Sequence, residues 1–327
     1  MRHLSDQGDE VSVAVLPHIA PVYAAMSAIH EILIWPFNRG QLQPIKRWRT
    51  ARLVRGKFNR VIICPNSFKN VLIPFFAGIP QRIGYVGEMR SSLLSTAFAN
   101  PDKHERGSMV NFYKKLAQTD DKDLDQNKIS VKSANDRPTL YVDPITVDAA
   151  LEQFGLSPLC YCVLAPGAEY GPAKRWSKEN FAQIALNLSH AQFQIVVLGS
   201  NADKGAADEI EQTCKAKGLN ILNLAGKTDL TQAIALIARA RGVISNDSGL
   251  MHIAAGFKRP QVAIFGSSSP QHTPPLNELA EVCWLSLPCS PCYKRICPLG
   301  HTNCLKNISV AQVEDSFYRS IKAESFI

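Results

Sequence analysis

The chain has 327 residues, of which 46% are hydrophobic and 20% are charged, a composition typical of globular proteins with room for two ordinary domains. No apolar run approaches the roughly 20 residues that span a bilayer, and the polar start MRHLSDQGDE does not resemble a signal peptide, so we expect a cytosolic protein. Because the cytosol is reducing, its nine cysteines are expected to be thiols or metal ligands before disulfides.

The formal net charge of +8 is unevenly distributed along the chain. No acidic residue occurs between Glu31 and Glu88. The same interval holds ten basic residues: Arg39, Lys46, Arg47, Arg49, Arg52, Arg55, Lys57, Arg60, Lys69 and Arg82. A field of one sign favours an anionic partner, such as nucleic acid, a phosphorylated glycolipid or an acidic membrane face. The alternative is that IKRWRTARLVRGK forms a solvated basic helix that binds nothing.

Short runs rich in β-branched residues recur along the chain, and helical patterns lie between most of them. Strands are predicted over residues 10–16, 31–35, 60–65, 160–166, 194–200, 221–226, 242–246 and 261–266. Helices are predicted for NFAQIALNLSHA, KGAADEIEQTCKAKG, LTQAIALIARARG, SGLMHIAAG and SVAQVEDSFYRSIKA. This alternation predicts an α/β fold with parallel sheets covered on both faces. It occurs in two blocks, and the polar residues 117–137 between them predict a loop or an inter-domain connection.

The segment SNDSGLMHIAAG, residues 245–256, joins a predicted strand to a predicted helix. In doubly wound sheets, ligands bind at the carboxyl ends of strands, where the next helix offers unpaired N–H groups. Asp247, Ser248 and Gly249 fall at this turn, and His252 lies on the same helical face as Ser248. The set predicts a diphosphate site. A helix cap alone would account for Asp247 or Ser248, but not for the accompanying glycine and histidine.

Three further strand–helix junctions carry similar residues. GAEYGPAKRWSKENF holds Lys174, which could place a point charge on a phosphate; the alternative is a surface loop before a helix capped by Ser177. VVLGSNADKG offers Asp203, and NLAGKTDL offers Thr228. Each junction alone is a weak signal. Together with residues 245–256, they predict a nucleotide site on one rim of the second block.

Three longer segments, PGAEYGPAKRW, SNDSGLMHIAAGFKRPQVAIFGSSSPQHTPP and NSFKNVLIPFFAGIPQRIGYVGEMR, closely resemble sequences of glycosyltransferase family 9. The resemblance implies a GT-B architecture with two Rossmann-like domains that face a cleft. It places an acceptor-binding domain at 1–140, a nucleotide-sugar-binding domain at 141–308, and a helix at 309–327 that crosses back onto the first domain. It also implies an inverting enzyme that moves heptose from ADP-heptose to the first heptose of the lipopolysaccharide inner core without a required cofactor.

The resemblance also implies roles for individual residues. The donor would be bound by Lys174, Asp203, Thr228, Asp247, Ser248, Gly249 and His252, with Asp203 and Thr228 near the ribose and adenine. The acceptor would be an anionic glycolipid, which would explain why one half of the chain is basic. Arg82 and Arg90 are the candidates for contact with this acceptor. We therefore expect a cytoplasmic enzyme, peripheral to the inner membrane, with no nucleic-acid partner.

Family members begin with a strand, a turn containing Gly-Asp and a helix, and the aspartate of that turn is the expected general base. The stretch MRHLSDQGDEVSVAV matches the segment after that turn, so the first strand, the turn and the base are expected to be missing, as with a start codon assigned too far downstream. Asp6 and Asp9 are expected to be solvated loop residues. The catalytic residue thus has no assignment. A non-catalytic nucleotide-sugar-binding protein, or a family 9 transferase with another acceptor, remains the alternative.

A cluster of cysteines lies near the C-terminus. Cys289, Cys292, Cys297 and Cys304 are spaced C-x2-C-x4-C-x6-C, with His301 inside. The first pair has the spacing of a zinc knuckle, but the second half does not. The cysteines could therefore bind a structural zinc, or they could be reduced thiols or form opportunistic disulfides. A catalytic metal is not expected, because four thiolates would close the coordination shell. A basic, zinc-bearing nucleic-acid binder would explain the charge and the cysteines, but not the four junctions.

Overall fold

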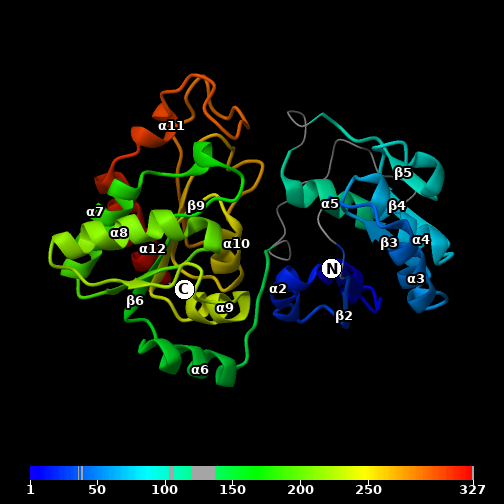
Figure 1. Ribbon diagram of the computed structural model, residues 1–327, viewed down its shortest axis with the longest axis horizontal. Coiled ribbons are helices and arrows are strands. Elements are labelled where there is room, and N and C mark those ends of the chain that lie inside the picture. The colour runs from blue at the N-terminus through cyan, green and yellow to red at the C-terminus, as the bar shows by residue number, and fades with distance from the viewer. Residues whose placement is uncertain (36, 38–39, 103–106, 119–136, 326–327) are drawn as a thin grey trace. The chain divides into compact units, whose positions relative to one another are not determined.

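The computed structural model describes residues 1–35, 37, 40–102, 107–118 and 137–325 (Figure 1). The chain forms two compact units, one of Met1–Pro17 and Leu33–Asp136, the other of His18–Ile32 and Arg137–Ile327. The change of unit at 136–137 lies close to the predicted boundary at 140, whereas the assignment of His18–Ile32 to the second unit was not expected. Most of the predicted polar connection, residues 119–136, lies outside the described residues, as does Arg39. Among the described residues, none of the helices combines the length and the apolar composition that a bilayer crossing needs.

The second unit is built on a six-stranded sheet in the order β11-β10-β9-β6-β7-β8, with all its neighbouring strands parallel. The strands are β6 (Tyr161–Ala165), β7 (Gln194–Val197), β8 (Leu222–Asn223), β9 (Gly242–Asn246), β10 (Gln261–Ile264) and β11 (Ala280–Cys283). The chain adds β7 and β8 on one side of β6, then returns to add β9, β10 and β11 on the other. This is the strand order of a Rossmann fold, and the reversal between β6 and β9 is where such sheets bind ligands.

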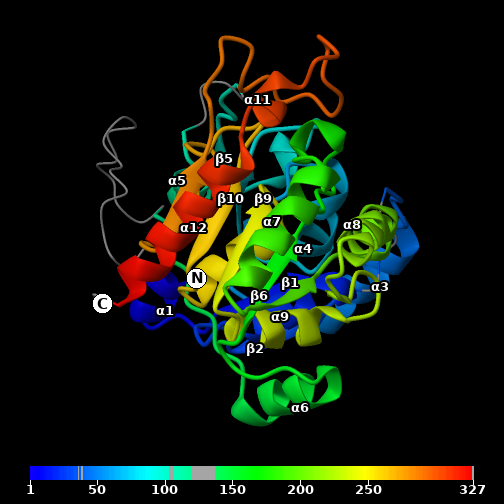
Figure 2. The ribbon, with the colours of Figure 1, turned by 90° about the vertical axis from the view of Figure 1, so that its left-hand side faces the viewer.

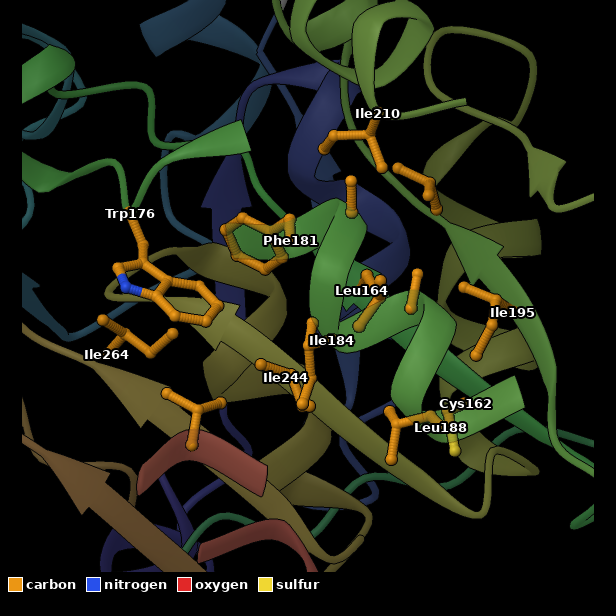
Figure 3. Packing of buried hydrophobic residues seen from close by; sticks show 14 of the residues in the cluster. Cys162, Leu164, Trp176, Phe181, Ile184, Leu188, Ile195, Ile210, Ile244 and Ile264 are labelled. Atoms are coloured by element: carbon orange, nitrogen blue, oxygen red, sulfur yellow. The ribbon is translucent and has the colours of Figure 1, made fainter. Parts of the chain in front are cut away.

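Helices cover both faces of this sheet (Figure 2). They are α6 (Pro144–Phe154), α7 (Lys178–His190), α8 (Lys204–Ala216), α9 (Leu230–Ala238), α10 (Gly249–Gly256) and α12 (Val310–Glu324); α2 (Ala20–Ala24) and α11 (Asn303–Lys306) complete the unit. Residues of α7, α8 and α12 share one buried cluster with Cys162 and Leu164 of β6, while residues of α6, α9 and α10 share another with Tyr161 and Val163. The alternation follows from the two-residue period of a strand. Figure 3 shows Trp176 and the α7 side chains on the first face.

Local signals in the sequence set the ends of these helices. The Ser177 hydroxyl accepts a hydrogen bond from the Asn180 N–H (3.1 Å) at the start of α7, and Ser309 caps α12 in the same way. Asp229 and Gln232 form a capping box at the start of α9. Helix α12 packs on β10 and β11 of the second unit. Its predicted return to the first domain stays a prediction.

The first unit contains a three-stranded parallel sheet, β3-β4-β5, and a separate pair of strands, β1-β2. Its elements are α1 (Arg2–Asp6), β1 (Ser12–Val15), β2 (Glu31–Ile34, which runs across the division between the units), α3 (Pro44–Val54), β3 (Arg60–Ile63), α4 (Leu72–Phe76), β4 (Gln81–Tyr85), β5 (Thr96–Phe98) and α5 (Met109–Ala117). Ala51 and Val54 of α3 pack with Ile73 of α4, and Tyr85 of β4 stacks on Phe112 of α5 at 3.9 Å. All eight predicted strands are present, but β4, β5 and β11 were missed.

Candidate functional site

Three loops meet around Asp247, at the carboxyl ends of β6, β9 and β10. The Asp247 carboxylate, with 5% of its side chain exposed, forms an ion pair with Lys174, which ends the 3-10 turn Pro172–Lys174 after β6. It also accepts hydrogen bonds from Ser268 Oγ (2.6 Å) and Thr273 Oγ1 (3.4 Å), which follow β10. Since these strands are neighbours, the sheet itself brings the three loops together, as the sequence predicted for the first two.

The N-terminus of α10 begins beside Asp247. Ser248 is its N-cap, yet within the described chain no side chain caps this helix, and the buried Ser248 Oγ has no partner. Gly249 is exposed, and a Cβ built on it would meet no atom within 4 Å. The first N–H groups of α10 therefore open onto space that an anion can approach closely, with a hydroxyl at hand and an ammonium group nearby.

His252 lies one turn into α10 and is electrostatically coupled to this corner. Partial burial lowers the pKa of its imidazole, and Lys174 lowers it further, whereas Asp247 raises it. The ring still reaches solvent. The net shift lowers the pKa of His252 below its ordinary value, so the neutral imidazole is favoured relative to a histidine free in water. The structure thus brings together all five residues predicted for the phosphates.

The other two predicted donor residues have different surroundings. The Asp203 carboxylate accepts hydrogen bonds from Ser200 N (3.0 Å) and Ser200 Oγ (2.7 Å), and pairs with Arg175 at 3.4 Å. A Cβ on Gly167 would lie 2.5 Å from Asp203 Oδ2, so the glycine allows the β6 loop to approach this carboxylate. Asp203 thereby fastens the turn after β7 to the loop after β6. Thr228 is half-buried before α9. Contacts of Asp203 and Thr228 with ribose or adenine stay predictions.

One positioning residue was missed from the sequence. Asn246, the last residue of β9, is fully buried; its Nδ2 donates to the Pro166 carbonyl (2.7 Å) and its Oδ1 accepts from Trp176 N (3.0 Å). These bonds tie both ends of the β6 loop to β9. They fix Lys174 against Asp247. The position of Asn246 immediately before Asp247 was the available signal. No local sequence pattern, however, indicates hydrogen-bond partners as distant in the chain as Pro166 and Trp176.

The two arginines predicted to contact the acceptor, Arg82 and Arg90, instead make hydrogen bonds within the protein. Arg90 is fully buried, and its guanidinium donates to the carbonyls of Tyr85 (2.7 Å) and Pro65. Direct contact of Arg90 with an acceptor is therefore at odds with this structure, because its donors hold the loops after β3 and β4. Arg82 is half-buried and donates to the carbonyls of Leu93 (2.7 Å) and Ile79, so its observed contacts are also structural.

The first unit has a shallow polar hollow that the sequence did not single out. It has a volume of about 260 Å³ and is lined by Gly40, Leu42, Ser67, Phe68, Lys69 and Glu88. The Glu88 carboxylate accepts a hydrogen bond from Phe68 N (2.8 Å), which fixes the loop after β3. Lys69 supplies the positive charge of this hollow. It is a better-placed group for an anionic acceptor than the buried Arg90.

The four cysteines of the C-terminal cluster line one small cavity together with His301, Ala173 and Ser267. Backbone N–H groups, Thr302 first among them, lower the pKa of the Cys297 thiol; burial raises that of Cys304, as do the other three thiols. Within the described residues, no three or more His, Cys, Asp or Glu side chains are arranged to hold a metal ion. The structural zinc stays a prediction, which metal analysis of the purified protein tests. The segment also supports the donor site, since the Arg295 carbonyl accepts from Ala173 N (3.1 Å).

Comparisons with known proteins agree with this geometry. The model of glycosyltransferase family 9 (heptosyltransferase) matches residues 47–303. The chain is 38% identical over 273 residues to lipopolysaccharide heptosyltransferase 2 of Escherichia coli K12, covering 80% of this chain and 75% of that protein. It is 36% identical over 271 residues to lipooligosaccharide heptosyltransferase 2 of Haemophilus influenzae, covering 80% and 76%.

Solved structures extend the comparison to nearly the whole chain. The structure of E. coli ADP-heptose lps heptosyltransferase II matches with a TM-score of 0.79 and 32% identity, covering 99% of this chain and 93% of that one. A family 9 glycosyltransferase from Veillonella parvula matches with a TM-score of 0.76 at 19% identity, covering 96% and 88%, which supports the fold alone. The predicted α/β fold of the GT-B class is confirmed.

Proposed function

Because the chain belongs to glycosyltransferase family 9, we propose that it transfers heptose from ADP-heptose to the first heptose of the lipopolysaccharide inner core, with inversion at the transferred sugar. The observation that carries the proposal is the ion pair of the partly exposed Lys174 with the buried Asp247 carboxylate, beside the uncapped N-terminus of α10. The Lys174–Asp247 pair carries no net charge, but it holds an ammonium group in place beside the α10 N–H groups, and together these donors can bind a diphosphate. Transferases of this family need such donors, because ADP leaves the sugar as an anion.

The chain's own groups would stabilise the leaving diphosphate. As the bond from the anomeric carbon to the phosphate oxygen breaks, negative charge grows on the β-phosphate. Lys174 and the first N–H groups of α10 stabilise that charge, and Ser248 donates its hydroxyl. Asp247 holds the lysine in place through an ion pair rather than reacting itself. The neutral His252 can take up a proton as the diphosphate binds.

The acceptor side is less fully assigned. The acceptor hydroxyl must lose a proton to a general base, and no described residue is given that role. Asp6 and Asp9 are exposed, as predicted, but Asp6 is the last residue of helix α1 instead of a loop residue, and Asp9 forms an ion pair with Arg60. For binding, Lys69 in the polar hollow of the first unit replaces Arg90 as the candidate contact with an anionic core sugar.

The proposed acceptor also implies a location. Its lipid anchor lies in a membrane, so the enzyme acts at the cytoplasmic face of the inner membrane as a peripheral protein. Support for this location comes from the acceptor named for the E. coli and H. influenzae relatives and from the basic interval between Glu31 and Glu88.

A transfer assay with ADP-heptose and a core acceptor that carries a single heptose tests the proposal. We expect ADP release matched by a gain of one heptose on the acceptor, measured by mass spectrometry. Tight binding of ADP-heptose without transfer would favour the non-catalytic binding protein. Transfer to a different lipopolysaccharide acceptor, with none to the one-heptose core, would instead place the chain elsewhere in the family.

A further inference from the structure

Helix α3 of the first unit (Figure 1) is anchored to its core by one face. Arg47, Ala51 and Val54 are buried at positions i, i+4 and i+7, which lie on one side of a helix. Ala51 and Val54 pack against Phe37, and the Arg47 guanidinium lies 4.3 Å from the Phe37 ring centroid. The helix is therefore held in a fixed orientation, with its opposite side turned to solvent.

The outward side of α3 is unusually apolar. Ile45, Trp48 and Leu53 are 69%, 45% and 71% exposed, and their spacing of i, i+3 and i+8 places them in one stripe. Scattered exposed apolar residues are ordinary, but here three large ones lie on the outward side of a single 11-residue helix. A surface that served only to keep the protein soluble would carry polar residues at these positions.

Cations are interleaved with these side chains. Arg49 and Arg52 occupy positions i+4 and i+7 of the same stripe, and the Arg52 guanidinium lies 5.2 Å from the Trp48 ring centroid. The chain has no acidic residue between Glu31 and Glu88, so no carboxylate on α3 can neutralise them. A stripe of Ile, Trp and Leu between arginines has the chemistry of a helix that lies in the headgroup region of an acidic membrane.

We propose that the outward face of α3, made of Ile45, Trp48, Arg49, Arg52 and Leu53, docks onto an anionic phospholipid bilayer. The arginines would bind lipid phosphates, Trp48 would sit at the interface, and the two aliphatic side chains would enter the acyl boundary. A nucleic acid could engage the arginines and Trp48, but it would leave Ile45 and Leu53 in water. The inference rests on the proposed function in one respect: an acceptor anchored in a membrane explains why the protein would bind a bilayer.

The second unit offers a control set of three exposed apolar side chains. Tyr141, Ile145 and Leu159 are 64%, 81% and 46% exposed, which is close to the exposure of the three α3 residues. Between Arg137 and Leu159 the chain holds the acidic residues Asp143, Asp148 and Glu152 and no basic residue, so the local sequence has the opposite charge to that of α3. Apolar exposure is thus similar in the two sets, and the local charge differs.

The test compares two triple variants of the full chain: Ile45→Ser, Trp48→Ser, Leu53→Ser and the control Tyr141→Ser, Ile145→Ser, Leu159→Ser. Co-sedimentation uses vesicles of phosphatidylglycerol and phosphatidylcholine in equal parts, and vesicles of phosphatidylcholine alone. The wild type and the control should bind the acidic vesicles, and the α3 variant should bind roughly 100-fold more weakly because it loses the insertion of three apolar side chains. Circular dichroism melts of both variants check that folding is intact.

Several outcomes would overturn the docking proposal. One is equal vesicle binding by the two folded variants. Another is equal binding of the wild type to acidic and to neutral vesicles. The third is tighter binding of the wild type to a short DNA duplex than to acidic vesicles. Transfer assays separate this proposal from the proposed function. The α3 variant should retain transfer to a water-soluble, deacylated acceptor and lose it to a vesicle-bound one. Absence of transfer by the wild type, with lipid binding as predicted, would reject the function and leave the docking surface standing.

Discussion

The two units of this chain handle charge in opposite ways. In the second unit, the Asp247 carboxylate is buried and pairs with the partly exposed Lys174, while Asn246 and Ser268 make hydrogen bonds that fix the loops around this pair. In the first unit, most of the basic residues of α3 lie exposed along the helix. A buried, preorganised charge suits one small ligand of fixed shape, whereas exposed charge suits a broad anionic surface. Donor recognition should therefore tolerate little change, and acceptor-side recognition should be spread over many groups.

The largest expected effect comes from the core that supports the donor site. Phe317 of α12 is fully buried, and a Cβ on Gly242 of β9 would lie 2.5 Å from its ring. We expect Phe317→Ala to lower the free energy of unfolding of the second unit by about 3–5 kcal/mol, because the cavity cannot close fully. The neighbouring Tyr318→Ala, at a position 38% exposed, should cost less than about 1 kcal/mol. Urea unfolding measures both, and similar losses for the two variants would contradict the prediction.

The next effect concerns the fixed charge itself. Lys174→Ala removes the ammonium group and leaves the Asp247 carboxylate buried without its partner. We expect kcat/KM for ADP-heptose to fall roughly 10²- to 10³-fold, the usual result of deleting one stabilising group at a developing anion. Lys178→Ala is the matched control, since Lys178 pairs with Glu209 on the exposed surface of the same unit. An unchanged kcat/KM in the Lys174 variant, or an equal loss in the control, would show that the diphosphate binds elsewhere.

A smaller effect is expected where the site is positioned by a neutral side chain. Asn246→Ala leaves the Trp176 N–H and the Pro166 carbonyl without their partner, which costs about 1–3 kcal/mol in stability. Because the β6 loop loses its tie to β9, the KM for ADP-heptose should also rise. Asn187→Ala is a fitting comparison, since its amide bonds Glu314 at a half-buried position. A KM that stays at the wild-type value would mean that Lys174 is held by other contacts.

The sequence predicted the second unit better than the first for a physical reason. Strands buried on both faces, such as β6 and β9, appear as continuous apolar runs, and their loops carry the site. Strand β4 contains Gln81, Arg82 and Gly84, and these polar and small residues interrupt the apolar pattern by which a short strand is predicted. The role of Arg90 could not be read from its charge, because its guanidinium is held by the carbonyl of Tyr85 at the end of β4 and by that of Pro65, which only the fold brings close. Asn246 escaped notice for the same reason, since its partners are brought to it only by the fold.

The smallest effect expected is a pH dependence that sets the two units apart. Partial burial lowers the pKa of His252 below its ordinary value of 6.5. In the free protein, stability should therefore fall as the pH drops below 6.5, because the unfolded chain takes up this proton more readily. Donor binding places a diphosphate near the ring and should raise its pKa, so that binding takes up a proton.

The affinity for ADP-heptose should consequently increase, roughly twofold to tenfold, as the pH falls from about 7.5 to about 5.5. The change is modest because the ring keeps contact with solvent. Calorimetry in buffers of different ionisation enthalpy measures both the affinity and the proton uptake, and His252→Gln should abolish the uptake while leaving vesicle binding through α3 unchanged. If the wild type and this variant showed the same pH profile, the imidazole would lie outside the field of the diphosphate, and the phosphate contacts would be left to Lys174, Ser248 and the α10 N–H groups.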